Sequence, residues 1–210
     1  MAHTLSNKAA LAAAIMSGFS VPALADASDG GFYLRAFGGA SLLSDTNLSG
    51  PVTGNSDFDA GQTFGAAVGY DYAGSPFRSE LEFAYRTGDA DGAAGVAGDF
   101  ASTTLAFNGY YDFTPIGGGK LTPYVGAGLA YVTEVDFDIS GGSAPGEYND
   151  SGAFGYQLMV GAAYPVSNRW ALTGEIRYFD AGNQSLTGPG GTLSADYDTV
   201  DFTLGAVFKF

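Results

Sequence analysis

The sequence predicts an all-β protein, a transmembrane antiparallel up-and-down β-barrel of eight strands. Three observations support this fold class: apolar and polar residues alternate within segments, eight such segments follow one another, and long and short connections alternate between them. The composition agrees, because the 210 residues include 33 Gly, 13 Tyr and 16 Phe but only 8 Lys and Arg. Aromatic residues are enriched in strands, and a chain of this length suits one barrel domain.

Alternation with a period of two is typical of a strand that has two different faces. Each segment is long enough to cross a bilayer as a tilted strand. The predicted strands are residues 31–43, 60–72, 77–87, 101–113, 122–136, 152–166, 169–180 and 197–210.

The connections between these segments are rich in Gly, Pro, Asn, Asp and Ser, which favour turns. Long loops are predicted at residues 44–59, 88–100, 137–151 and 181–196, and short turns at 73–76, 114–121 and 167–168. Long loops at one end and short turns at the other are typical of bacterial outer-membrane barrels, in which the short turns are periplasmic.

One face of all eight predicted strands carries no Asp, Glu, Lys or Arg, whereas the other face carries the charge. Placing the apolar face in water would cost roughly 1.5–3 kcal/mol for each large side chain, and a lipid-facing Arg or Lys would cost about 2–4 kcal/mol. The apolar face is therefore predicted to meet lipid and the charged face to line the lumen. A soluble barrel shows the inverse arrangement. The charged register contains Arg35, Asp71, Arg78, Glu80, Glu82, Arg86, Asp112, Glu134, Glu175, Arg177, Asp201 and Lys209.

A subset of these charges is predicted to form an ion-pair network that fills the lumen. Charges in a narrow interior are costly unless they are paired, and side chains fill an eight-stranded barrel. The alternative is that the same charges line a narrow, porin-like channel for small solutes or ions, since inward glycines leave some room. The predicted network consists of Arg35, Arg78, Glu80, Glu82, Arg86, Glu134, Glu175 and Arg177.

Residues 1–25 have the pattern of a cleaved secretory signal peptide. A short polar start ends in Lys8, an apolar run follows, and Ala23 and Ala25 supply the small side chains of a cleavage site. Residues 26–210 are then expected to form the exported barrel domain.

The residue types give little support to catalysis. Cysteine is absent and the single histidine is His3, inside the predicted leader, so the usual nucleophile, general-base and metal-ligand options are missing. We expect no enzyme activity, no cofactor and no metal site; an outer-membrane enzyme is a distant alternative. The formal net charge of −14 disfavours nucleic acid as a partner.

Acidic residues gather in the predicted long loops. They favour solubility, and a weaker hypothesis is that they bind divalent cations that bridge to lipopolysaccharide. These residues are Asp89, Asp91, Asp99, Asp136, Asp138, Glu147, Asp150, Asp196 and Asp198.

Three segments carry a resemblance to a known family: Gly31-Phe32-Tyr33-Leu34, residues 122–131 (TPYVGAGLAY) and residues 202–210 (FTLGAVFKF). With them, nearly the whole mature chain resembles the small OmpA/OmpX-like, opacity-protein-like, porin-family outer-membrane β-barrels. The resemblance implies a monomeric barrel in the outer membrane of a Gram-negative bacterium, in contact with lipid and lipopolysaccharide.

The resemblance also implies a function and an assembly signal. Roles in this family range from envelope integrity to adhesion or small-solute leakage, so we expect a structural or surface-interaction role, with an extracellular or host ligand at the acidic loops. The closing segment resembles the signal that the barrel-assembly machinery reads, which places that signal on Leu204, Ala206, Phe208 and Phe210.

Overall fold

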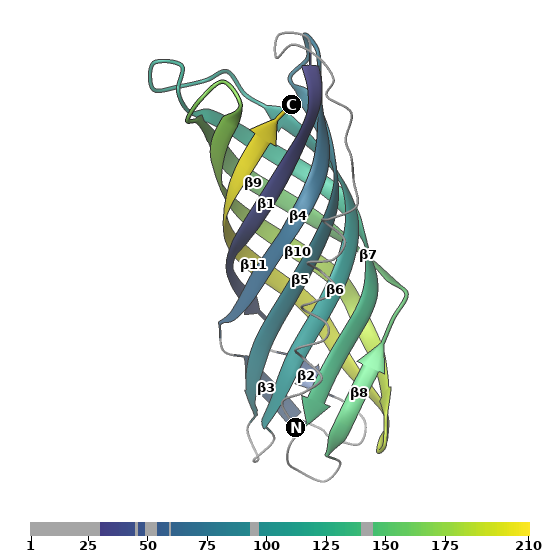
Figure 1. Ribbon diagram of the computed structural model, residues 1–210. Coiled ribbons are helices and arrows are strands. Elements are labelled where there is room, and N and C mark those ends of the chain that lie inside the picture. The colour runs from purple at the N-terminus through teal and green to yellow at the C-terminus, as the bar shows by residue number, and fades with distance from the viewer. Residues whose placement is uncertain (1–29, 45, 49–53, 59, 93–96, 140–144) are drawn as a thin grey trace.

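A computed structural model describes residues 30–44, 46–48, 54–58, 60–92, 97–139 and 145–210 (Figure 1). Among these residues, no helix is long and apolar enough to cross a membrane. The strands are β1 (Gly30–Leu43), β2 (Thr46–Leu48), β3 (Gly54–Phe58), β4 (Gly61–Tyr72), β5 (Phe77–Gly92), β6 (Ala97–Asp112), β7 (Thr122–Ile139), β8 (Gly146–Asp150), β9 (Ala153–Pro165), β10 (Trp170–Gly188) and β11 (Gly191–Lys209).

Eight of the described strands form a closed antiparallel ring in the order β1, β4, β5, β6, β7, β9, β10, β11. The ring closes where β11 pairs with β1, from Tyr33 opposite Lys209 to Leu43 opposite Thr199. Closure leaves no sheet edge, as lipid requires, because the bilayer core offers no water to an unpaired backbone group. The predicted eight-stranded barrel is confirmed.

The short strands β2, β3 and β8 continue the barrel wall beyond this ring. β2 pairs with β3 and continues the register of the β1–β4 pair. β3 also pairs with β5. β8 pairs with β7 and continues the register of the β7–β9 pair. All three lie at the end of the barrel opposite the C-terminus (Figure 1). Together with residues 88–92, 97–101, 135–139, 181–188 and 191–198 of the long strands, they form what we call the extension.

The prediction of long loops is therefore wrong over much of their described length. Residues 88–92 and 97–100, 137–139 and 146–150, and 181–188 and 191–196 are strands. Their Gly, Asp and Ser content resembles that of turns, but in residues 137–139 and 146–148 the side chains still alternate between a buried and an exposed face. The pattern of backbone pairing overrides the local preference of these residue types.

The outer face of the ring is apolar, as the sequence predicted. Leu129, Phe154 and Leu204 expose 73%, 77% and 77% of their surface, and Leu81 and Phe107 expose more than half. Exposing each of these side chains to water would cost roughly 1.5–3 kcal/mol relative to burying it. These side chains therefore mark the surface that faces lipid.

Inside the ring, aromatic side chains lie over glycines of the neighbouring strand. Tyr33 is paired directly with Gly69, and Tyr110 with Gly126. A Cβ on either glycine would overlap the facing ring. The same contact joins Phe37 to Gly65 and Tyr124 to Gly161. Glycine at these positions lets large rings fit into a narrow lumen.

This packing predicts that Gly69→Ala lowers the free energy of unfolding by about 1–3 kcal/mol, the usual cost of overpacking. Gly109→Ala is the matched control, because Gly109 lies on the outer face with open space around its Cα. Urea unfolding of the refolded protein in lipid vesicles measures both. Equal midpoints for the two variants would contradict the proposed packing.

Candidate functional site

The centre of the lumen holds a four-membered group of ion pairs. Arg177, on β10, donates to Glu82 (Nη2 to Oε2, 2.7 Å) and to Glu175 (Nη2 to Oε1, 2.8 Å). Arg35, on β1, donates to the same two carboxylates, at 3.0 Å to Glu175 and 3.2 Å to Glu82. All four side chains are almost fully buried, and Gln157 adds a hydrogen bond to Glu82 at 3.3 Å.

A second group lies towards the short turns. Arg78 donates to Glu80 (2.8 Å) and to Asp112 (3.1 Å), and its guanidinium lies 4.0 Å from the ring centre of Tyr110. Tyr33 also donates to Glu80, at 2.8 Å. Arg78 and Asp112 are the members of this group with partial exposure, so it faces the short-turn mouth of the barrel.

A third group lies on the other side of the centre. Arg86 donates to Asp201 at 2.9 Å and to Thr104 at 3.2 Å, and Ser41 donates to Asp201 at 2.7 Å. The Arg86 guanidinium lies 4.8 Å from the ring centre of Phe179. Over the three groups, four arginines face five carboxylates, of which Asp112 is the partly exposed one.

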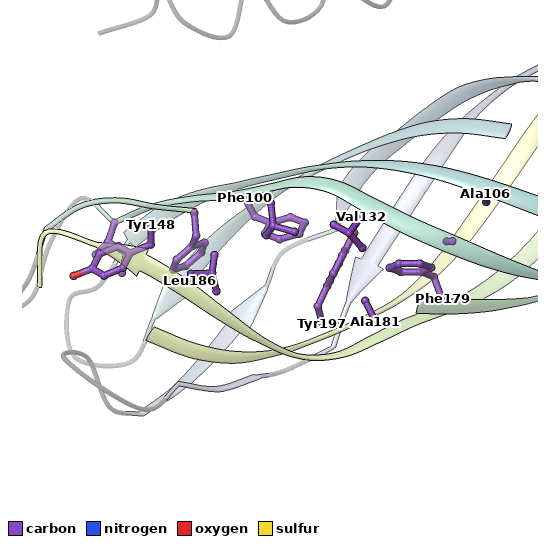
Figure 2. Packing of buried hydrophobic residues seen from close by; sticks show 12 residues of the cluster. Phe100, Ala106, Val132, Tyr148, Phe179, Ala181, Leu186 and Tyr197 are labelled. Atoms are coloured by element: carbon purple, nitrogen blue, oxygen red, sulfur yellow. The ribbon is translucent and has the colours of Figure 1, made fainter. Parts of the chain in front are cut away.

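Beyond Arg86 the interior becomes apolar. Phe179, Tyr197, Val132 and Phe100 belong to one buried cluster that continues to Tyr148 and Leu186 near the far end of the extension. Figure 2 shows these side chains lying along the inside of the wall. Burial raises the pKa of the Tyr197 phenol, which lies in the extension, above its ordinary value. The interior thus changes from charged to mainly apolar at Phe179 and Val132, which lie in the ring next to the extension.

The structure places seven of the eight predicted network residues in these groups and Glu134 outside them. Thr133 is an extra residue in β7, since Thr103 pairs with Glu134 while Thr104 pairs with Val132. This β-bulge reverses the register, so Glu134 is exposed and Val135 is buried. A strict period of two cannot indicate such an insertion.

The remaining predicted residues lie elsewhere. Leu204, Ala206, Phe208 and Phe210 follow one another on the outer side at the end of the chain, and the rings of Phe208 and Phe210 are 5.5 Å apart. Their role as an assembly signal stays a prediction. Ala23 and Ala25 lie outside the described residues, as does the whole of the predicted leader.

Sequence reasoning missed the hydrogen bonds of the inward tyrosines. Tyr33 donates to Glu80, and Tyr124 donates to Glu175 at 3.1 Å. Both occupy the charged register, where an aromatic ring with a hydroxyl is a signal for a network member. Asp201 lay in the predicted register but outside the predicted network.

The polarity of the wall inverts where the ring meets the extension. Within the ring the outer face is apolar and the lumen is charged, whereas in the extension Phe100, Phe137 and Tyr148 point inward. Their neighbours Asp99, Asp138 and Glu147 are exposed. The extension therefore has the pattern of a barrel in water.

The extension is also strongly acidic. As defined above, it contains ten of the chain's 22 acidic residues and none of its eight basic residues. Asp89, Asp99, Asp138 and Glu147 are exposed and occupy directly paired positions on four adjacent strands. Like charges opposite one another destabilise a sheet, so this row costs stability.

In the described part of the chain, no group of three or more His, Cys, Asp or Glu side chains is arranged to hold a metal ion. The charged groups of the lumen pair with one another instead.

A family model described as the outer membrane protein beta-barrel domain matches residues 11–210. The chain belongs to this family. Membership places this barrel in the outer membrane, in agreement with the lipid-facing ring. A comparison with curated protein sequences gave no match.

Solved structures of small outer-membrane barrels share this barrel's fold. Neisserial surface protein A is 18% identical with a TM-score of 0.58, over 85% of this chain and 97% of that one. OprG from Pseudomonas aeruginosa is 16% identical with a TM-score of 0.53, over 89% and 100%. The outer membrane protein AlkL is 18% identical with a TM-score of 0.50, over 92% and 97%.

The network predicts very different losses of stability for the same Glu→Gln change at two positions. Glu82→Gln leaves Arg35 and Arg177 with an uncompensated buried charge and should cost about 3–5 kcal/mol of unfolding free energy. Glu134→Gln changes an exposed carboxylate and should cost less than about 1 kcal/mol. Urea titrations of the two variants in the same lipid test this prediction. Equal losses of unfolding free energy would contradict the exposed position of Glu134.

Proposed function

We propose that this barrel is a structural and surface-interaction protein whose extension carries a rigid, acidic binding surface outside the membrane. The observation that carries the proposal is the inversion of polarity where the ring meets the extension, which we call the rim. There Asp99 and Asp138 point outward and Phe100 and Phe137 point inward. The short turns of such barrels are periplasmic, so the extension faces the exterior.

The interior supports a structural role more than transport. Arg177, Arg35, Glu82 and Glu175 meet across the lumen, and the apolar cluster around Phe179 follows them along the axis. Opening a passage would separate buried ion pairs, which is strongly unfavourable. A solute would therefore meet a polar obstacle and then an apolar one.

The extension supports surface interaction because its hairpins are held in place. Tyr148, Leu186 and Phe137 are almost fully buried inside it, and paired strands continue to Gly188 opposite Gly191. Ordered hairpins lose less conformational entropy on binding than flexible loops do.

The charge of the extension defines the class of ligand. With ten acidic residues and no basic residue, it favours cationic ligands, or anionic lipopolysaccharide through bridging divalent cations. A barrel whose ring closes on itself requires no second copy, so we infer a monomer. Export by a cleaved leader and folding by the barrel-assembly machinery belong to the same proposal.

A binding measurement tests the acidic surface. Fluorescent oligolysine should bind the protein in zwitterionic lipid nanodiscs, and the triple variant Asp99→Asn, Asp138→Asn and Glu147→Gln should bind about tenfold more weakly, since each exposed pair contributes roughly 0.2–1 kcal/mol. Asp71→Asn is the control, because Asp71 pairs with Lys209 at the short-turn end. Equal affinity of the triple variant, or binding that is insensitive to salt, would contradict the proposal.

Planar-bilayer recording tests the closed lumen. The refolded protein should give no discrete conductance steps, because the network and the apolar cluster occupy the interior. Reproducible single-channel steps that change in Arg177→Met would instead establish the narrow channel as the function.

A further inference from the structure

Two of the short turns carry exposed apolar side chains. Ile116, between β6 and β7, exposes 55% of its surface, and Val166, between β9 and β10, exposes 59%. They continue an outer band of aromatic rings at this end of the barrel, in which the ring of Trp170 lies 4.9 Å from that of Phe208. Such rings gather where lipid meets water. These two turns therefore lie at the level of the lipid headgroups.

The same two turns each carry an exposed basic residue, Lys120 in one and Arg169 in the other. The turns are neighbours, because β7 begins where the first turn ends and β9 ends where the second begins. These two strands are paired at this end of the barrel, with Thr122 opposite Ala163 (Figure 1). The two cations thus belong to one side of the short-turn end.

Backbone hydrogen bonds hold both residues in place. The Lys120 amide donates to the Ile116 carbonyl at 3.2 Å, and the Arg169 carbonyl accepts from the Lys209 amide at 2.8 Å. A ligand of these cations therefore meets an ordered backbone, which lowers the entropic cost of binding.

The protein neutralises neither cation. At this end of the barrel the carboxylates of Asp71 and Asp112 are already paired with other basic residues, at 2.6 Å and 3.1 Å. Within the described residues, this leaves Lys120 and Arg169 without a carboxylate partner. The extension, at the other end, is acidic and has no basic residue. The unpaired positive charge of the described chain is therefore confined to the short-turn end.

The position and the charge together select the ligand. Phospholipid phosphates lie at the level of the headgroups, and lysines and arginines near an anionic membrane surface are attracted to it. A guanidinium such as that of Arg169 also binds phosphate oxygens through two parallel hydrogen bonds. A zwitterionic headgroup has no net charge to match the two unpaired cations.

We propose that Lys120 and Arg169 form a binding surface for the headgroup of an anionic phospholipid in the periplasmic leaflet. This surface lies at the opposite end of the barrel from the acidic extension and is independent of any ligand bound there.

The single tryptophan of the chain is a reporter for this surface. Trp170 directly follows Arg169 and exposes half of its surface on the outer side, so brominated acyl chains that contact it will quench its fluorescence. The protein is refolded in vesicles of equal parts phosphatidylglycerol and phosphatidylcholine, with bromine on one lipid or on the other. Both leaflets have the same composition, so the direction of insertion does not matter.

Quenching should show phosphatidylglycerol enriched about fivefold at Trp170 in low salt, because each basic residue near the surface adds to the attraction. The enrichment should fall at about 0.5 M salt, which screens exposed charges. Equal quenching by the two brominated lipids, or an enrichment that salt leaves unchanged, would overturn the proposal.

Variants separate local charge from net charge. Lys120→Gln combined with Arg169→Gln should abolish the enrichment, whereas Arg169→Lys keeps the charge and should retain it. Asp99→Asn combined with Asp138→Asn changes the formal charge by the same amount at the other end and should leave the enrichment at Trp170 unchanged. All four substituted side chains are exposed, so these variants are expected to fold. Enrichment that survives in the Gln double variant, or that changes in the Asn double variant, is the contrary result.

Discussion

Every charge within the membrane-spanning ring must find its partner inside the barrel, because lipid supplies neither water nor counter-ions. The interior meets this constraint with arginines that each contact more than one acceptor, as Arg177 does with Glu82 and Glu175. The pairs connect strands far apart in the sequence, since Arg35 and Glu175 lie 140 residues apart. The network therefore supports the closed ring as well as neutralising the lumen.

The same constraint ends at the membrane surface. Beyond the rim the outer face meets water, so the pattern of the wall inverts and the inside must supply the apolar contacts. The cluster around Phe179 and Tyr197 does this, and it lies directly above the Arg86–Asp201 pair. The same barrel wall thus faces lipid in the ring, where its charges point inward, and water in the extension, where its charges point outward. The acidic row of the extension costs stability in isolation, which supports the proposed binding surface.

The sequence predicted the ring well because lipid enforces a strict rule. No charged residue is allowed on one face, and alternation in each segment shows where that face lies. The prediction from sequence failed for the extension because there the charged face points outward and the residue types resemble those of loops. The runs Asp136-Phe137-Asp138 and Asp196-Tyr197-Asp198 carry the inverted pattern, so a search for alternation of either sign would have found these strands. Glu134 was misplaced by a single inserted residue, and the partners of Tyr33 and Tyr124 depend on distances that no linear pattern contains.

The most direct test of the account is a spin-label accessibility scan along the outer face of β6. The chain has no cysteine, so single cysteines can be placed at Phe107, Leu105 and Asp99 without further changes. Labels at Phe107 and Leu105 should collide mainly with lipid-soluble oxygen, and the label at Asp99 should collide mainly with a water-soluble nickel complex. Oxygen preference at all three positions, or nickel preference at all three, would contradict the inversion of polarity at the rim.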